Sequence, residues 1–160
     1  MRSLIFVLGL VLIFSCNNNG TSSEDVSEDS VLVDEEVLPG GKQIWIADYD
    51  TIKQQFFLKK QRTTNTDTLT AETLISYINE AWENVILVFN KVSNDTLYVS
   101  IPDNDFLAER MGSAGAEAYM ASTTYNLTEL KGIRFVNYNF KEGDHLSPGV
   151  FSRDDFGNFH

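Results

Sequence analysis

The chain has 160 residues, with 12 Lys and Arg against 23 Asp and Glu, and its formal net charge is −11 at pH 7. A chain this acidic, without a basic cluster, repels nucleic-acid phosphates and anionic lipid headgroups, so we expect no nucleic acid among its partners. The single cysteine excludes an intramolecular disulfide, and the folded part must therefore rely on its apolar core.

Residues 1–15 have the pattern of an export signal. Arg2 supplies a positive charge, residues 4–14 (LIFVLGLVLIF) are apolar, and Ser15 precedes Cys16. A helix over this run is roughly 16 Å long, about half of a bilayer core, which fits a signal-peptide core and not a membrane span. The segment resembles a bacterial lipoprotein signal, which implies that the leader is removed and that Cys16 becomes a lipidated first residue. The alternative is an ordinary secretory signal with an incidental cysteine.

Residues 16–41 are predicted to form a lipidated, acidic and disordered tether. Residues 17–41 contain seven acidic side chains and no Lys, Arg or aromatic residue. Such a segment buries too little apolar surface to offset the entropy that is lost on ordering. A short docked strand near its end is the alternative, formed by Val31, Leu32, Val33, Val37 and Leu38.

Residues 42–160 are predicted to form one folded domain, because this length buries on the order of 65% of the unfolded surface. Residues 43–47 (QIWIA) and 52–58 (IKQQFFL) favour strands. Thr70 is a predicted N-cap of a helix. The apolar face of that helix has helical spacing and comprises Leu74, Ile78, Ala81, Trp82 and Val85.

The next segments predict a hairpin, a second helix and a last strand. Residues 85–92 and 96–101 are β-rich and flank a turn, residues 113–130 favour a helix, and residues 133–140 favour a strand. The order predicts an α+β fold with two helices packed on one face of a small, mostly antiparallel sheet, whose core spans about residues 69–140.

Part of this domain carries a family resemblance. A strand at 96–101 precedes the helix start Gly112-Ser113-Ala114-Gly115-Ala116-Glu117, and YNLTEL at 125–130 precedes Lys131-Gly132-Ile133. Residues 95–140 thereby resemble the GerMN-type domain of sporulation and spore-germination lipoproteins and related envelope proteins, with Lys131 where the family usually has proline. The resemblance implies a fold similar to ring-building modules of envelope assemblies, without established catalytic residues. Its motif residues here are Gly112, Ser113, Gly115, Glu117 and Gly132.

The small residues at 112–118 have two interpretations. Their lack of bulk allows one end of a helix to lie close to a neighbouring element, and Gly132 suits the left-handed conformation that ends helices. The alternative is an anion-binding helix N-terminus. Against it, Arg110 is the nearby base, Glu109 and Glu117 flank it, and no Lys-Ser/Thr pair follows.

Few residues are candidates for catalysis or metal binding. His145 could share a metal site with Asp144, Asp154 and Asp155, although no spacing predicts it. The run 103–105 (DND) resembles the start of a calcium loop, but neither glycine nor a closing Glu follows, which favours a turn.

A serine hydrolase would need His145 as its base, and the chain has no Gly-x-Ser-x-Gly motif. Trp45 and Trp82 could stack on sugars, although Trp82 lies on the apolar helix face. Four triplets also resemble an O-glycosylation signal of Gram-negative envelope proteins: Asp29-Ser30-Val31, Asp50-Thr51-Ile52, Asp67-Thr68-Leu69 and Asp95-Thr96-Leu97.

These observations favour a lipid-anchored envelope protein with a non-catalytic interaction or assembly domain, on the outer membrane and facing the periplasm or the cell surface. We expect a membrane contact through Cys16, an envelope protein partner or self-association, and no catalytic residue, metal or cofactor. The alternatives are a glycan- or small-ligand-binding module and an unrecognised hydrolase. The leader and tether indicate a Gram-negative envelope, so a role in sporulation is not inferred.

Overall fold

The computed structural model describes residues 41–65 and 67–159. The predicted leader, Cys16 and the tether up to residue 40 lie outside the described residues. In chain order the elements are β1 (Trp45–Asp50), β2 (Gln55–Lys60), α1 (Ala71–Ala81), β3 (Val88–Ser93), β4 (Thr96–Ser100), a π-helical turn η1 (Phe106–Arg110), α2 (Gly112–Leu127), β5 (Phe135–Asn139), β6 (Gly149–Phe151) and a 3-10 segment η2 (Arg153–Phe159). None of the helices in this part of the chain is long and apolar enough to cross a membrane.

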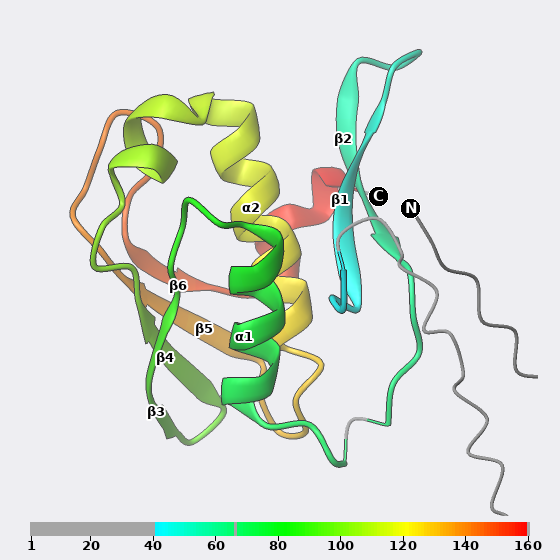
Figure 1. The fold of residues 1–160 in the computed structure, drawn as a ribbon, viewed down its shortest axis with the longest axis vertical. Coiled ribbons are helices and arrows are strands. Elements are labelled where there is room, and N and C mark those ends of the chain that lie inside the picture. The colour runs from blue at the N-terminus through cyan, green and yellow to red at the C-terminus, as the bar shows by residue number, and fades with distance from the viewer. Residues whose placement is uncertain (1–40, 66, 160) are drawn as a thin grey trace, which may run out of the picture. The chain divides into compact units, whose positions relative to one another are not determined.

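The main sheet has four strands in the order β3-β4-β5-β6. Its outer pairs are antiparallel, whereas β4 and β5 are parallel because the chain returns through α2 between them. Both helices lie on one side of this sheet (Figure 1). The predicted α+β class, with two helices on one face of a mostly antiparallel sheet, is therefore confirmed.

The N-terminal strands form a second sheet. β1 and β2 pair with each other and with no strand of the main sheet, and the register runs from Trp45 opposite Lys60 to Asp50 opposite Gln55. Both strands contact α2, on the side away from the main sheet (Figure 1). The prediction of a single sheet is therefore too simple, because α2 separates the first two strands from the others.

This position explains the burial of α2. Every residue from 118 to 127 is buried. The main sheet, the β1–β2 hairpin, α1 and η2 all contact this helix. Its small Ala, Ser and Thr side chains leave room for neighbours on all sides, as expected of a central helix. The helix ends at Leu127, three residues earlier than predicted, and begins at Gly112, one residue earlier.

Hydroxyl groups lie inside this core, between α2 and the sheet. Thr124 Oγ1 and Tyr138 Oη are 3.0 Å apart and hydrogen-bonded. The hydroxyls of Tyr119 and Thr123 are also buried but have no hydrogen-bond partner among the described residues. Burial raises the pKa of the Tyr119 hydroxyl. The nearby Thr123 hydroxyl lowers that pKa in part, although Tyr119 Oη and Thr123 Oγ1 are not hydrogen-bonded to each other.

Several local predictions agree with the structure. Thr70 caps α1, since its Oγ1 accepts a hydrogen bond from the Thr73 N–H at 3.2 Å. Gly132 has a φ of 82°, in the left-handed region, but it lies in the turn before β5 and not at the helix end. The last twenty residues contain β6 and η2. The rings of Phe156 and Phe159 in this segment are buried and pack in the core.

Candidate interaction surface

The four-stranded sheet has one buried and one exposed face. Leu97 and Val99 of β4 and Val136 and Tyr138 of β5 are buried on the helix side. The strand register places the alternate residues on the opposite face, where they are exposed or half-buried. This outer face consists of Val88, Lys91, Ser93, Thr96, Tyr98, Ser100, Phe135, Asn137, Asn139 and Val150.

The outer face differs in charge from the rest of the chain. No Asp or Glu occurs in β3, β4, β5 or β6, although the chain has 23 acidic residues. Lys91 Nζ lies 4.8 Å from the centre of the Tyr98 ring, and the Arg134 guanidinium lies 5.2 Å from that of Phe135. Arg134 also forms an exposed ion pair with Asp95 at 3.7 Å. Aromatic and amide side chains with few acids are typical of the core of protein interfaces.

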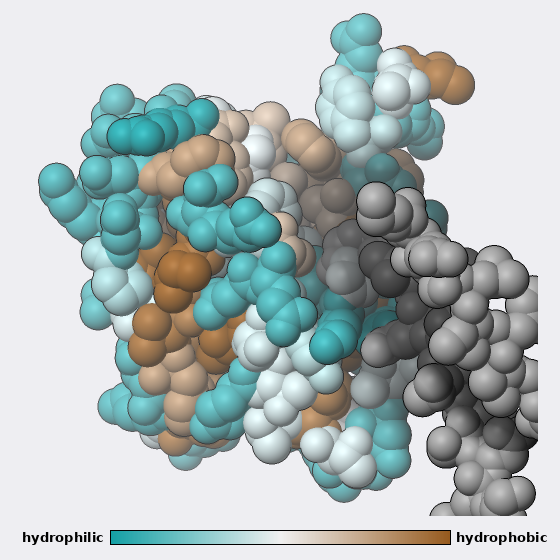
Figure 2. Space-filling model, viewed as in Figure 1, coloured by the Kyte–Doolittle hydropathy of each residue, from teal (hydrophilic) through white to brown (hydrophobic). Residues whose placement is uncertain are grey.

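The edge of this sheet at β3 exposes apolar side chains. Ile86, Val88 and Val92 are 50%, 39% and 48% exposed. Figure 2 shows a band of hydrophobic surface there, beside α1. Single exposed apolar residues are common on protein surfaces, but three within seven residues at one sheet edge indicate a contact site, with Val88 on the outer face and Val92 on the helix side.

A side chain of α1 holds the segment that leads into this edge. Asn79 Nδ2 donates to the Leu87 carbonyl at 2.9 Å, and Asn79 Oδ1 accepts from the Leu87 N–H at 2.9 Å. These two bonds imitate a strand partner for one residue. Beyond Leu87, β3 pairs with β4 alone within the described part of the chain, so its other edge is open.

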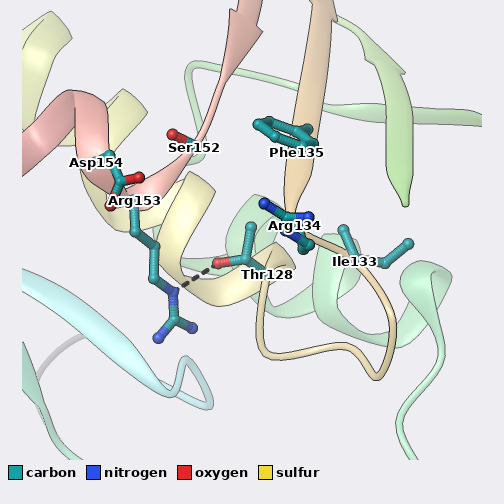
Figure 3. Close-up of a pocket in the computed structure, with 7 residues that line it drawn as sticks. All are labelled: Thr128, Ile133, Arg134, Phe135, Ser152, Arg153 and Asp154. Atoms are coloured by element: carbon teal, nitrogen blue, oxygen red, sulfur yellow. Dashed lines mark hydrogen bonds between the residues drawn. The ribbon is translucent and has the colours of Figure 1, made fainter. Parts of the chain in front are cut away.

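A shallow pocket borders the outer face beside Arg134 and Phe135 (Figure 3). Arg153 also lines it, but its Nε donates to Thr128 Oγ1 at 2.8 Å and its guanidinium is directed toward β1. Among the described residues its lining is Thr128, Ile133, Arg134, Phe135, Ser152, Arg153 and Asp154. Phe135 is the one aromatic residue of this set, so these residues do not provide the paired rings that a sugar site would use.

Glu129 joins the N-terminal hairpin, α2 and the C-terminal segment. Its side chain is 13% exposed and accepts hydrogen bonds at 2.8 Å from both Trp45 Nε1 and Arg153 Nη2, with Lys60 Nζ at 3.4 Å. Burial raises the pKa of Glu129, but the bonds from Trp45 and Arg153 and the two positive charges outweigh it, and the pKa is lowered.

Both tryptophans pack against other aromatic rings. Trp45 packs edge-on against Tyr125 with ring centres 5.1 Å apart, and the cations of Lys60 and Arg153 lie over its ring. Trp82 packs edge-on against Tyr119 at 5.3 Å. Both rings therefore have structural partners, which argues against the predicted alternative of sugar stacking.

The structure places the GerMN-like motif residues in different surroundings. Gly112 has a φ of 72°, and a Cβ on Gly115 would lie 2.6 Å from Met111 Cγ. Glu117 accepts a hydrogen bond from Asn158 Nδ2 at 3.2 Å, which ties the helix to the C-terminal segment. Ser113 lies on the surface and contacts the loop after β5. An added Cβ on Gly112 or Gly132 would have no atom within 4 Å, so the packing interpretation applies to the buried Ala116 and Ala118 and not to these glycines.

His145 lies within hydrogen-bond distance of one predicted motif residue. Ser113 Oγ and His145 Nδ1 are 3.1 Å apart at an exposed position. No carboxylate is hydrogen-bonded to His145 within the part of the chain that is described. The same residues contain no group of three or more His, Cys, Asp or Glu that could hold a metal ion.

The residues that resemble a calcium loop form a turn. Asp103 Oδ1 accepts the Asp105 N–H at 3.3 Å, and Asn104 Nδ2 donates to the Lys141 carbonyl at 2.6 Å. The first bond is local, in agreement with the interpretation as a turn, and the second joins the turn to the segment that follows β5.

The glycosylation-like triplets differ in exposure. Thr51 is exposed in the β1–β2 turn, Thr68 is exposed before α1, and Thr96 is half-buried in β4. Asp50 has a structural role beside Thr51, since its Oδ1 accepts the N–H groups of Ile52 and Lys53 at 2.9 Å. The triplet at Ser30 lies outside the described residues.

Comparisons of the chain with protein-family models, with curated proteins and with solved structures give no significant match.

Proposed function

We propose that this chain is a lipid-anchored protein of a bacterial cell envelope, and that its folded domain is a non-catalytic interaction module. The observation that carries the proposal is the outer face of the four-stranded sheet. It has no acidic residue in a chain of net charge −11, and Val150 on it is 54% exposed. A surface of this composition is favourable for contact with another protein.

The anchor in this proposal is Cys16. Its support is the sequence pattern of positive start, apolar run and small residue before the only cysteine. Two or more acyl chains would bind a membrane stably, since each buried methylene contributes about 0.8 kcal/mol. The 25 residues of the tether give the domain a root-mean-square reach of about 25–30 Å from the membrane.

We also propose kinship with GerMN-type domains for residues 95–140. The support is the sequence motif together with the element order β4, α2, β5 in this segment. Kinship would make an assembly role the natural function, because the resemblance implies no catalytic residues.

An affinity experiment tests the proposed interaction. The full chain is recovered from detergent-solubilised envelopes of the bacterium that encodes it, as wild type and as Val150→Asp and Ile52→Asp variants. Val150 lies on the outer face, whereas Ile52 is 93% exposed at the hairpin turn and serves as the control. We expect a specific envelope protein to be retained by the wild type and by Ile52→Asp and to be lost from Val150→Asp.

Two results would count against the proposal. One is a strictly monomeric protein that retains nothing. The other is equal loss of the retained protein from both variants, which would show that the outer face has no special role. The anchor is tested separately by mass spectrometry of the mature N-terminus, where a free thiol at Cys16 would refute lipidation.

A further inference from the structure

The edge strand β3 is the longer open edge of the main sheet. It has six residues, whereas β6 at the opposite edge has three. Long apolar edges readily accept another strand, because their unpaired N–H and C=O groups and exposed side chains form a template. The exposed residues Val88 and Val92 lie on this strand, and Ile86 lies just before it.

The charge of the chain limits which partner can approach this edge. Residues 42–160 carry sixteen acidic and eleven basic side chains, so two copies of the chain repel each other over most of their surfaces. The four strands of the main sheet carry no acid and one base, Lys91. A second copy therefore meets the least repulsion when it approaches through this sheet.

We infer that β3 pairs antiparallel with β3 of a second copy of this chain, so that two four-stranded sheets become one continuous sheet. This inference rests on the proposed interaction function and adds a contact with a second copy at the edge of the same sheet. Beyond β3, the Arg134–Asp95 ion pair keeps the nearest acid of the β3–β4 turn neutralised.

The sequence of β3 is complementary to itself in one register. When Asn90 lies opposite Lys91 of the second copy, Phe89 lies opposite Val92 and Val88 lies opposite Ser93. The register shift between Phe89 and Lys91 in the β3–β4 pairing places Phe89 and Val92 on the helix side and Val88 and Ser93 on the outer side. Each proposed pair therefore has both side chains on one face, and no two Lys91 side chains are directly opposed.

Two features of β3 act against other registers. The irregularity around Asn90 and the charge of Lys91 are devices that limit unselective edge pairing. In the proposed register both lie next to the two-fold axis, and each Lys91 lies opposite Asn90 of the second copy. Six paired residues make a small interface, so the contact is weak in dilute solution and gains from the high local concentration of chains tethered to one membrane.

Cysteine crosslinking in the envelope tests this pairing on the full chain. The chain has one native cysteine, Cys16, so an introduced thiol is the only one in the folded domain. In the proposed dimer the two Asn90 Cα atoms lie about 6 Å apart, within the range that a disulfide bridges. We expect mild oxidation to give a dimer-sized product from Asn90→Cys and monomer from the controls Val150→Cys, Ile52→Cys and wild type.

A second variant tests the edge itself. Adding Val92→Asp to Asn90→Cys places a charge at the half-exposed position opposite Phe89, and we expect at least a tenfold loss of crosslinked dimer. Adding Val150→Asp instead should leave the dimer unchanged. Circular dichroism of each purified variant reports whether the fold is retained.

The outcomes separate this inference from the proposed function. Monomer alone from Asn90→Cys, or dimer that is insensitive to Val92→Asp in a folded protein, overturns the pairing with a second copy. A product with a different protein also overturns it, but agrees with an interaction domain. When Asn90→Cys gives monomer and the affinity experiment retains no protein, both proposals fail.

Discussion

Replacement of Asn126 by Leu should destabilise this protein more than any surface change, because the Asn126 side chain joins the N-terminal hairpin to α2. Its Oδ1 accepts the N–H groups of Ile44 and Trp45 at 2.8 and 3.0 Å. Its Nδ2 donates to the carbonyls of Trp45 and Ser122 at 2.7 and 2.8 Å. The residue is fully buried. Leucine has a similar size, so the change removes the four hydrogen bonds with little loss of volume.

The expected loss of stability follows from the backbone groups that lose their hydrogen-bond partner. The Ile44 and Trp45 N–H groups would lose their acceptor, and a buried donor without a partner costs about 1–3 kcal/mol. We therefore expect the free energy of unfolding to fall by about 2–6 kcal/mol, a large part of the roughly 5–15 kcal/mol of an ordinary domain. Asn139→Leu, an exposed change on the outer face, should alter it by less than about 0.5 kcal/mol.

Urea unfolding followed by circular dichroism measures the global effect, and amide hydrogen exchange locates it. In Asn126→Leu the amides of β1 and β2 should exchange faster than those of β4 and β5, because the lost bonds attach the hairpin. An unfolding free energy within about 1 kcal/mol of wild type, with an unchanged denaturant slope, would refute this account of how the hairpin is held.

Further substitutions and a labelling experiment test other parts of the structure. Glu129→Gln should lower the unfolding free energy at pH 7 by about 2 kcal/mol. The folded-state pKa of Glu129 lies below its ordinary value of 4.5, so the stability difference between wild type and variant should persist above pH 4.5 and narrow as the pH falls below 4.5. Unfolding free energies measured over a series of acidic pH values test this. Tyr119→Phe removes a buried hydroxyl without a partner and should be neutral or stabilising by up to about 1 kcal/mol in urea unfolding, whereas Tyr138→Phe breaks the bond to Thr124 and should cost about 1 kcal/mol. Gly143→Ala places a Cβ 2.4 Å from that of Ala108 and should lower thermal stability by about 1–3 kcal/mol, and Gly157→Ala, with no atom within 4 Å, is its control. A fluorophosphonate probe should leave Ser113 unlabelled by mass spectrometry, and labelling that His145→Ala abolishes would instead support the hydrolase alternative.

The sequence predicts those elements whose signals are local. Thr70 and the apolar spacing after it define α1, and the alternation in residues 96–101 defines β4 with its buried Leu97 and Val99. The hairpin with β3 follows from the short turn between two β-rich runs, in which Asn94 has a positive φ of 55°. Each of these features depends on residues within one or two turns of the chain.

The remainder depends on contacts between distant segments. Nothing around Asn126 distinguishes it from a surface asparagine, because its partners Ile44 and Trp45 lie more than 80 residues away. The same applies to the separate β1–β2 sheet and to the C-terminal aromatic residues Phe156 and Phe159. Their short strand and 3-10 segment have weak local signals, and packing on α2 determines their structure.

The segment at the proposed interaction edge contains both buried and exposed apolar side chains. In residues 85–92 (VILVFNKV), Val85 and Leu87 are buried, whereas Ile86, Val88 and Val92 are among the exposed large apolar residues. A strand in the middle of a sheet would bury both sets, and a run this apolar is typical of such a position. The chain nevertheless places the run at an edge, with no further strand of the described residues beside it. The mismatch between a sequence suited to a central strand and a position at an edge is the physical reason to expect an additional strand there.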